Sequence, residues 1–78
     1  MDKAAGYEGY VIQASPYQLA EGGRWSTHLE ISRVDGDLLT TMPYSAGNTH
    51  DSEEDAIKHS LNFGRKIIDG EVPGCSAP

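Results

Sequence analysis

The sequence predicts an α+β fold of two layers, in which a three-stranded antiparallel β-meander precedes one C-terminal helix that packs on one face of the sheet. Three observations indicate this order, β-β-β-α. Segments with the composition or alternation of strands precede residue 45, an Asp-Gly turn signal separates two of them, and one capped amphipathic stretch begins after residue 51. Because a single helix covers only one side, the other sheet face is expected to stay open.

The first two strands flank a long connection. Residues 10–14, Tyr-Val-Ile-Gln-Ala, are rich in β-branched and aromatic types, and Pro16 ends this strand because proline lacks the N–H that a ladder needs. Residues 16–24 then turn the chain at Gly22 and Gly23, which tolerate positive φ. Residues 25–34 alternate strictly, which gives the second strand one largely apolar face, formed by Trp25, Thr27, Leu29 and Ile31.

A tight hairpin is predicted between the second and third strands. Asp35-Gly36 suits a type I′ turn because both residues tolerate positive φ, and this turn pairs Val34 with Asp37. The resulting register continues the apolar face into the third strand, with Ile31 opposite Thr40, Leu29 opposite Met42 and Thr27 opposite Tyr44. Pro43 predicts that the third strand lies at a sheet edge or ends there.

One helix is well specified, after a loop expected over residues 45–50. Ser52 can cap its first turn, and the three acidic residues that follow complement the positive end of the helix dipole. Apolar positions recur at helical spacing along one stripe, formed by Ile57, Leu61, Gly64 and Ile68. Gly70 can supply the left-handed residue that ends the helix. Gly64 lowers helix propensity by about 1 kcal/mol relative to alanine, which indicates either a close approach to the sheet or plain tolerance.

Length and charge restrict the class of protein. The 78 residues carry 12 acidic and 6 basic side chains, a net charge of −6, and we expect one domain over residues 7–70 with disordered tails at 1–6 and 71–78. No apolar run approaches the roughly 18 residues of a membrane span, and the N-terminus does not resemble a signal peptide. We therefore expect a soluble cytoplasmic protein with no membrane partner.

No motif predicts a catalytic or metal site. His28, His50 and His59 lack the i, i+4 or His-x-His spacing of metal ligands, and whether they converge in space is left open. Because Cys75 is the one cysteine, no internal disulfide and no cluster of thiolate ligands can form, and we expect it to be an incidental exposed thiol. We expect no cofactor and no enzymatic activity.

The open sheet face is the first candidate for function. Its expected composition is mixed, both apolar and polar, as in many contact surfaces. Aromatic and arginine side chains border the Gly-Gly loop nearby, and these types are enriched at binding hot spots. The candidate contact residues are Tyr17, Arg24, Trp25, His28 and Leu39. Trp25 is also in phase with the core residues of its strand, so a core position is the alternative for it.

A basic helix surface offers the second candidate. Lys58, Arg65 and Lys66 share the outer side of the helix, where they could contact nucleic acid. Three cations give few phosphate contacts, and the net negative charge opposes binding at long range. The first hypothesis is therefore an interaction domain that binds another protein or itself through the open face or the edge of the third strand, and the alternative is a nucleic-acid-binding regulator.

Several segments in succession resemble a family. Tyr7-Glu-Gly-Tyr-Val-Ile12, Glu21-Gly-Gly-Arg-Trp25, Ser52-Glu-Glu-Asp-Ala56 and Gly64-Arg-Lys-Ile-Ile-Asp-Gly70 are similar to short uncharacterised bacterial proteins, some of them labelled HlyU-like transcriptional activators. The resemblance covers most of residues 7–70. It implies a shared fold, and its label implies a transcriptional regulator, but it identifies no active residues. No helix-turn-helix pattern accompanies it.

Overall fold

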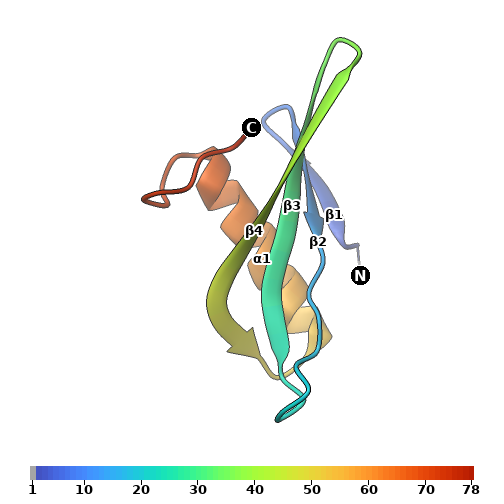
Figure 1. The fold of residues 1–78 in the computed structure, drawn as a ribbon, viewed down its shortest axis with the longest axis vertical. Helices are drawn as coiled ribbons and strands as arrows, with labels where there is room; N and C mark the ends of the chain where they lie inside the picture. The colour runs from blue at the N-terminus through green and yellow to red at the C-terminus, as the bar shows by residue number, and fades with distance from the viewer. Residues whose placement is uncertain (1) are drawn as a thin grey trace.

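The computed structural model describes residues 2–78 and has one antiparallel sheet and one helix (Figure 1). The sheet has the order β1-β2-β3-β4, and every neighbouring pair is antiparallel. The elements are β1 (Ala4–Tyr7), β2 (Tyr10–Ala14), β3 (Trp25–Asp35), β4 (Leu38–His50) and α1 (Glu53–Ile68). The predicted α+β class and C-terminal helix are confirmed, whereas the prediction of three strands is wrong because there are four.

The additional strand is β1, in a segment expected to be a tail. Tyr7 pairs with Tyr10 across a two-residue loop, in which Glu8 and Gly9 have φ of 51° and 84°. Positive φ at both central positions is what a type I′ turn requires. The sequence obscures this hairpin because glutamate rarely adopts positive φ and the Ala-Ala-Gly of β1 has low strand propensity.

The hairpin between β3 and β4 turns one residue later than predicted. Asp35 pairs with Leu38, so Gly36 and Asp37 form the loop, and only Gly36 of the two has positive φ, at 64°. This pattern fits a type II′ turn, which needs glycine at the first central position alone. The register consequently shifts by two residues, and Ile31 lies opposite Met42. Because side chains alternate with period two, every residue keeps its predicted face.

β4 extends through residues 45–50, which were expected to form a loop. Thr27 pairs with Ala46 but Ser26 pairs with Thr49, so Gly47 and Asn48 are extra residues in a bulge. Glycine and asparagine inside a strand are typical of such a bulge, which bends the strand. The prediction that the strand with Pro43 lies at a sheet edge is confirmed.

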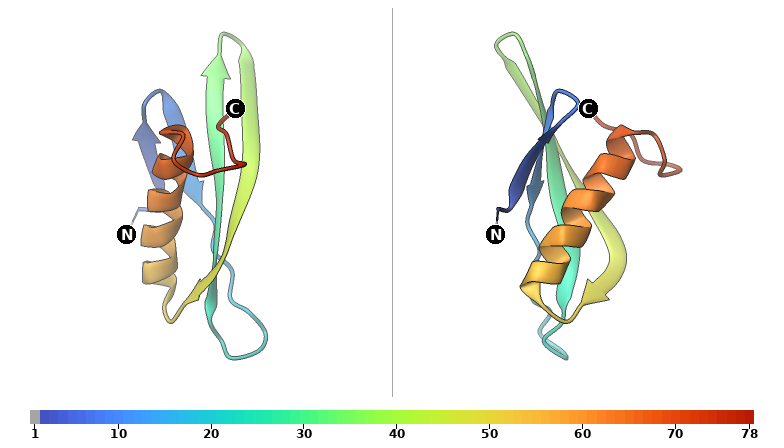
Figure 2. Two further views of the ribbon diagram at one scale, coloured as in Figure 1. Left: turned by 90° about the vertical axis from the view of Figure 1, so that its left-hand side faces the viewer. Right: turned by 180° about the vertical axis from the view of Figure 1, so that it is seen from behind.

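The core lies between α1 and one face of the sheet, as two views of the molecule show (Figure 2). Its fully buried side chains are Ile12, Leu29, Ile31 and Ile67. Gly64 meets the sheet at this point: a Cβ there would lie 2.7 Å from Ile12 Cγ2 and 2.9 Å from Leu29 Cδ1. Close approach, rather than tolerance, therefore explains the glycine in the helix stripe.

The helix ends are formed by the expected residues. The Ser52 hydroxyl accepts a hydrogen bond of 3.1 Å from the Asp55 main-chain N–H. Gly70 follows the helix with φ of 76°, and the Glu71 N–H donates to the Lys66 carbonyl at 2.9 Å. Both caps satisfy main-chain groups that would otherwise lack partners at the helix termini.

Residues 71–78, expected to be disordered, run back across the helix side of the sheet (Figure 2). The Tyr44 hydroxyl donates to the Ser76 carbonyl at 2.5 Å, and the Tyr10 hydroxyl donates to the main-chain oxygen of Pro78 at 3.1 Å. Cys75 is half-buried against the core cluster and is therefore not the freely exposed thiol that was expected. Tyrosine hydroxyls from two strands thus hold a segment whose composition carries no signal for order.

Candidate functional site

The β3–β4 hairpin extends beyond the helix and beyond β1 and β2 (Figure 1). We call its outer part, residues 33–42, the hairpin arm. Large apolar side chains are exposed on both of its faces. Val34 and Leu39, paired with each other on the open face, are 70% and 63% exposed, and on the helix side Leu38 and Met42 are 64% and 41% exposed. Neither face of the arm is covered by the helix, so these side chains have no packing partners comparable to the core.

The free edge of β4 is the second feature of this surface. The Ser15 N–H donates to the His28 carbonyl at 2.9 Å, so His28 directs its main-chain groups toward β2. Main-chain direction alternates along a strand, and the odd-numbered residues of β3 therefore bond to β4. By the same alternation Leu39, Thr41, Pro43 and Ser45 direct their main-chain groups outward. Pro43 lies where its missing N–H costs no bond to β3, which explains its tolerance here.

Tyr17 and His28, two of the predicted contact residues, lie together at the opposite end of the sheet from the arm. Their rings meet edge to face with centroids 6.1 Å apart. The Ser15 hydroxyl is 2.9 Å from His28 Nδ1, and Ser26 exchanges bonds with Tyr17 through its hydroxyl and its main-chain N–H. Tyr17 is 55% exposed, so this pair is a small ordered patch on the surface.

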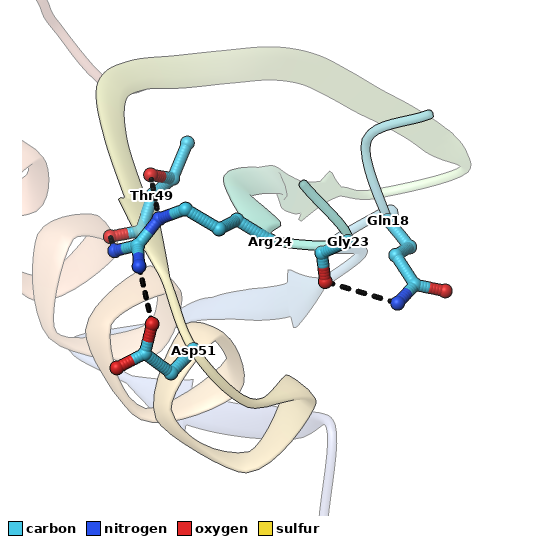
Figure 3. A network of polar contacts seen from close by, with 5 residues as sticks. All are labelled: Gln18, Gly23, Arg24, Thr49 and Asp51. Atoms are coloured by element: carbon cyan, nitrogen blue, oxygen red, sulfur yellow. Dashed lines mark hydrogen bonds and ion pairs between the residues drawn. The ribbon is translucent and has the colours of Figure 1, made fainter. Parts of the chain in front are cut away.

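Arg24 lies beside the Gly-Gly loop as predicted, but its guanidinium is engaged within the chain (Figure 3). It donates to Thr49 Oγ1 at 2.7 Å and to the Thr49 carbonyl at 3.0 Å, and it forms an ion pair with Asp51. These contacts attach the Gly-Gly loop to the junction between β4 and α1. The side chain therefore fixes the end of β4 and has few donors left for a partner.

The remaining predicted contact residues are separated from each other. Trp25 is half-buried at the start of β3, opposite His50, and does not belong to the core cluster. Leu39 lies on the hairpin arm, near the other end of β3. The five predicted residues thus form two groups rather than one surface: Tyr17, Arg24, Trp25 and His28 at one end, and Leu39 at the other.

A cleft opens between α1 and β4, where the bulge bends β4. Its volume is about 120 Å³, and it is lined by Thr27, Ala46, Asn48, His59, Asn62, Phe63 and Lys66. A second hollow of about 230 Å³ adjoins it and is lined by Lys58, His59, Asn62 and Arg65. Asn48, Asn62 and Thr27 were not among the predicted site residues. The Gly-Asn pair inside a strand was the signal for the bulge that creates this cleft.

Two of the three histidines converge beside this cleft. The rings of His50 and His59 stack with centroids 4.2 Å apart and an interplanar angle of 13°. His50 Nε2 is 2.9 Å from the buried Thr27 hydroxyl. Burial lowers the pKa of His50, and the neighbouring His59 lowers it further. His28 does not join this pair, since it bonds to Ser15 on the open face.

The lowered pKa predicts a pH dependence of stability. A histidine that titrates below its ordinary pKa of about 6.5 favours folding in its neutral form, so this contribution is complete above that pH and is lost as the pH falls through the folded-state pKa. We expect the free energy of unfolding to decrease between about pH 7 and pH 5. The His50→Gln variant should show a flatter profile in urea titrations. An unchanged profile would contradict the assignment to His50.

The described part of the chain, residues 2–78, contains no group of three or more His, Cys, Asp or Glu side chains that could hold a metal ion. None of the helices described there is long and apolar enough to cross a membrane.

The fold and surface define a class: a small α+β domain whose helix covers one face of a four-stranded antiparallel sheet and whose edge hairpin projects from the body. The chain belongs to the family described as Domain of unknown function (DUF6566), whose model matches residues 2–77. The expected resemblance to an uncharacterised family is thus confirmed, while a bacterial origin and the HlyU-like label stay predictions. No curated protein and no solved structure matches the chain.

Proposed function

We propose that this protein is a non-enzymatic interaction domain that associates with a second copy of itself through the β4 edge of the hairpin arm. One observation carries the proposal. The edge strand, Leu38–His50, contains no Asp, Glu, Lys or Arg among its 13 residues, and its outer part exposes apolar side chains on both faces. Exposed edges are usually protected by charges, prolines, short strands or bulges. In β4 the proline and the bulge lie at 43 and 47–48, so residues 38–42 have none of these protections, which favours pairing with another strand. The lone cysteine, which has no disulfide partner in the chain, fits a reducing setting such as the cytoplasm.

A two-fold axis through Thr40 gives a register for this association. Leu39 then lies opposite Thr41 of the second copy, and both residues direct their main-chain groups outward. In an antiparallel ladder such a pair exchanges both main-chain hydrogen bonds, and the symmetry repeats the exchange on the other side of the axis. Pro43 lies just outside the residue pairs that exchange two hydrogen bonds, where its carbonyl can still accept a main-chain hydrogen bond from the second copy.

The same register covers the apolar side chains of the arm. On the helix side Leu38 lies opposite Met42 of the second copy, and Met42 opposite its Leu38, while on the open face the two Leu39 side chains become diagonal neighbours. Directly opposed side chains in antiparallel strands have Cβ atoms about 4.5–5.5 Å apart. Three of the four large apolar side chains of the arm, Leu38, Leu39 and Met42, therefore gain partners across the new seam, while Val34 keeps Leu39 as its neighbour.

Charge favours a second copy over a basic partner at this surface. Two chains of net charge −6 repel each other over most of their surfaces, and a close approach is least costly along an uncharged strand. Within the arm, on β3, Arg33 and Asp35 already pair with each other at 3.2 Å. The edge offers no cluster of carboxylates that would select a basic protein.

The test measures the monomer–dimer equilibrium by sedimentation velocity over a range of concentrations. Thr41→Pro removes an outward N–H in the paired segment and, like Pro43, leaves the bonds to β3 intact. We expect it to weaken association at least ten-fold. Ser45→Pro is the matched control, because it makes the same change at an outward position beyond the paired segment, and its dimer constant should stay that of the parent chain.

Three results would overturn self-association through this edge. They are a monomer at every concentration, a dimer unaffected by Thr41→Pro, and equal effects of the two prolines. Amide spectra of both variants verify that the monomer fold is retained. If the chain is monomeric, capture of a different protein that Leu39→Lys abolishes would assign the arm to a heterotypic partner instead.

A further inference from the structure

We infer that the cleft between α1 and β4 binds the phosphate group of a small phosphomonoester. This inference is independent of the association proposed for β4, because the cleft lies at the bulged end of that strand and the proposed dimer uses the arm.

The electrostatic character of the cleft opposes that of the whole protein. Lys58, Arg65 and Lys66, half of the chain's six lysine and arginine residues, line the cleft or the hollow that adjoins it. None of the 12 acidic residues lines either one. His59 and Asn62 line both, so the two spaces are continuous along the helix. In a protein of net charge −6, three cations thus gather along one side of the helix, Lys66 at the cleft and Lys58 and Arg65 at the hollow beside it.

The uncharged lining supplies hydrogen-bond donors of suitable type. Asn48 of β4 and Asn62 of α1 line the cleft and carry side-chain amides, and His59, which also lines it, carries ring nitrogens. Phosphate carries a charge of about −1.5 to −2 near neutral pH and has three acceptor oxygens in a monoester. A site with several cations and amide donors suits a phosphate dianion better than it suits a carboxylate ligand, because a carboxylate carries only one charge.

The dimensions indicate a small ligand. The cleft, at about 120 Å³, has room for one tetrahedral anion, and the adjoining hollow gives the rest of a small ligand an open exit along the helix. Phe63 and Ala46 form the apolar part of the wall, where the ester substituent can pack. Lys58 and Arg65, in the more open hollow, remain available to the outer oxygens of the ligand.

The histidine pair makes this end of the cleft well ordered. His50 stacks on His59 and bonds to the Thr27 hydroxyl, and Thr27 and His59 both belong to the cleft wall. The Arg24 contacts with Thr49 and Asp51 hold the adjoining end of β4. Thr27 and His59 are therefore positioned before a ligand arrives, which lowers the entropic cost of binding at this end of the cleft.

The experiment is an NMR titration of the full chain at constant pH and constant ionic strength, with chloride replaced by inorganic phosphate and, separately, by glycerol phosphate. We expect saturable shifts in the backbone and side-chain amides of Asn48 and Asn62 and in the His59 ring. Lys66→Gln should weaken binding at least ten-fold. Lys3→Gln makes the same charge change away from the cleft and should leave the affinity unchanged within two-fold.

A third titration uses a short single-stranded oligonucleotide, which carries the same phosphate chemistry on a polymer. Shifts with the oligonucleotide alone, centred on Lys58 and Arg65 and lost at high salt, would overturn the small-ligand assignment and support nucleic-acid contact. Absence of saturable shifts with either phosphate compound would also overturn it, as would equal losses in the two lysine variants. If Lys66→Gln perturbs the fold, Asn62→Ala provides the second test of the same cleft.

Discussion

The Gly64→Leu chain is expected not to fold. Even the first atom of a new side chain at this position, the Cβ, would lie 2.7 Å from Ile12 Cγ2 and 2.9 Å from Leu29 Cδ1. Ile12 Cγ2 is attached directly to its own Cβ and can move only if χ1 or the strand moves. The helix and β2 must therefore separate to admit leucine, and their separation disrupts the core that both elements share.

The expected magnitudes follow from two opposing effects. Alanine at position 64 gains about 1 kcal/mol of helix propensity but overpacks the contact with the sheet, which typically costs about 1–3 kcal/mol. We expect Gly64→Ala to lower the free energy of unfolding by about 1 kcal/mol. Leucine adds three more carbon atoms at the same place, and the loss should exceed the few kcal/mol that stabilise a domain of this size.

Circular dichroism and urea unfolding measure both changes. Asn62→Ala is the control, since it improves helix propensity at an exposed position of the same helix and should alter stability by only a few tenths of a kcal/mol. If Gly64→Leu retained cooperative unfolding, or if Gly64→Ala stabilised the protein as propensity alone predicts, close packing at this glycine would not be its role.

Leu29→Ala is expected to cost about 3 kcal/mol, within the range of roughly 2–5 kcal/mol for buried leucine. Leu29 is fully buried at the centre of the sheet, between Ala14 of β2 and Tyr44 of β4. Its removal leaves a cavity under the helix that the neighbouring side chains can fill only in part. Leu39→Ala is the matched control: the residue is 63% exposed, and in dilute solution we expect a change within about 0.5 kcal/mol.

Combining Leu29→Ala with Gly64→Ala tests whether the two residues share one contact. The alanine at position 29 no longer reaches the Cβ added at position 64, and the cavity left by the leucine can accommodate part of the new methyl group. The loss caused by Gly64→Ala should therefore be smaller in the Leu29→Ala background than in the parent chain, a coupling that contacting residues usually show. Strict additivity would show that Leu29 does not restrict position 64.

Part of the candidate site was accessible from the sequence. Residue types and spacing indicate the acidic overall charge, the uncharged run after Asp37 and the edge character of the strand with Pro43. They also place Lys58, Arg65 and Lys66 on the same side of the helix. Arg24 illustrates the limit of that reasoning, because its residue type suggested a free contact residue and its ion pair with Asp51 makes it a structural connection. A contact between residues 27 positions apart has no local signal.

The sequence by itself determined the elements whose signals are local. The Ser52 cap, the helix stripe with Gly70 at its end, and the alternation of β3 all depend on neighbouring residues, and each element formed as its pattern predicted. Which face of β3 is buried also followed, because a register error of two residues preserves the side-chain faces. These features depend on propensity and period, which a short window of sequence contains.

Only the tertiary structure decided the rest. The weak strand β1 forms because β2 supplies its hydrogen bonds, and residues 71–78 lie against the sheet because Tyr10 and Tyr44 bond to their main chain. The stacking of His50 on His59 and the cleft beside them depend on a bulge that bends β4 away from the helix. In each case the deciding free energy comes from partners distant in sequence, so no local pattern can specify it.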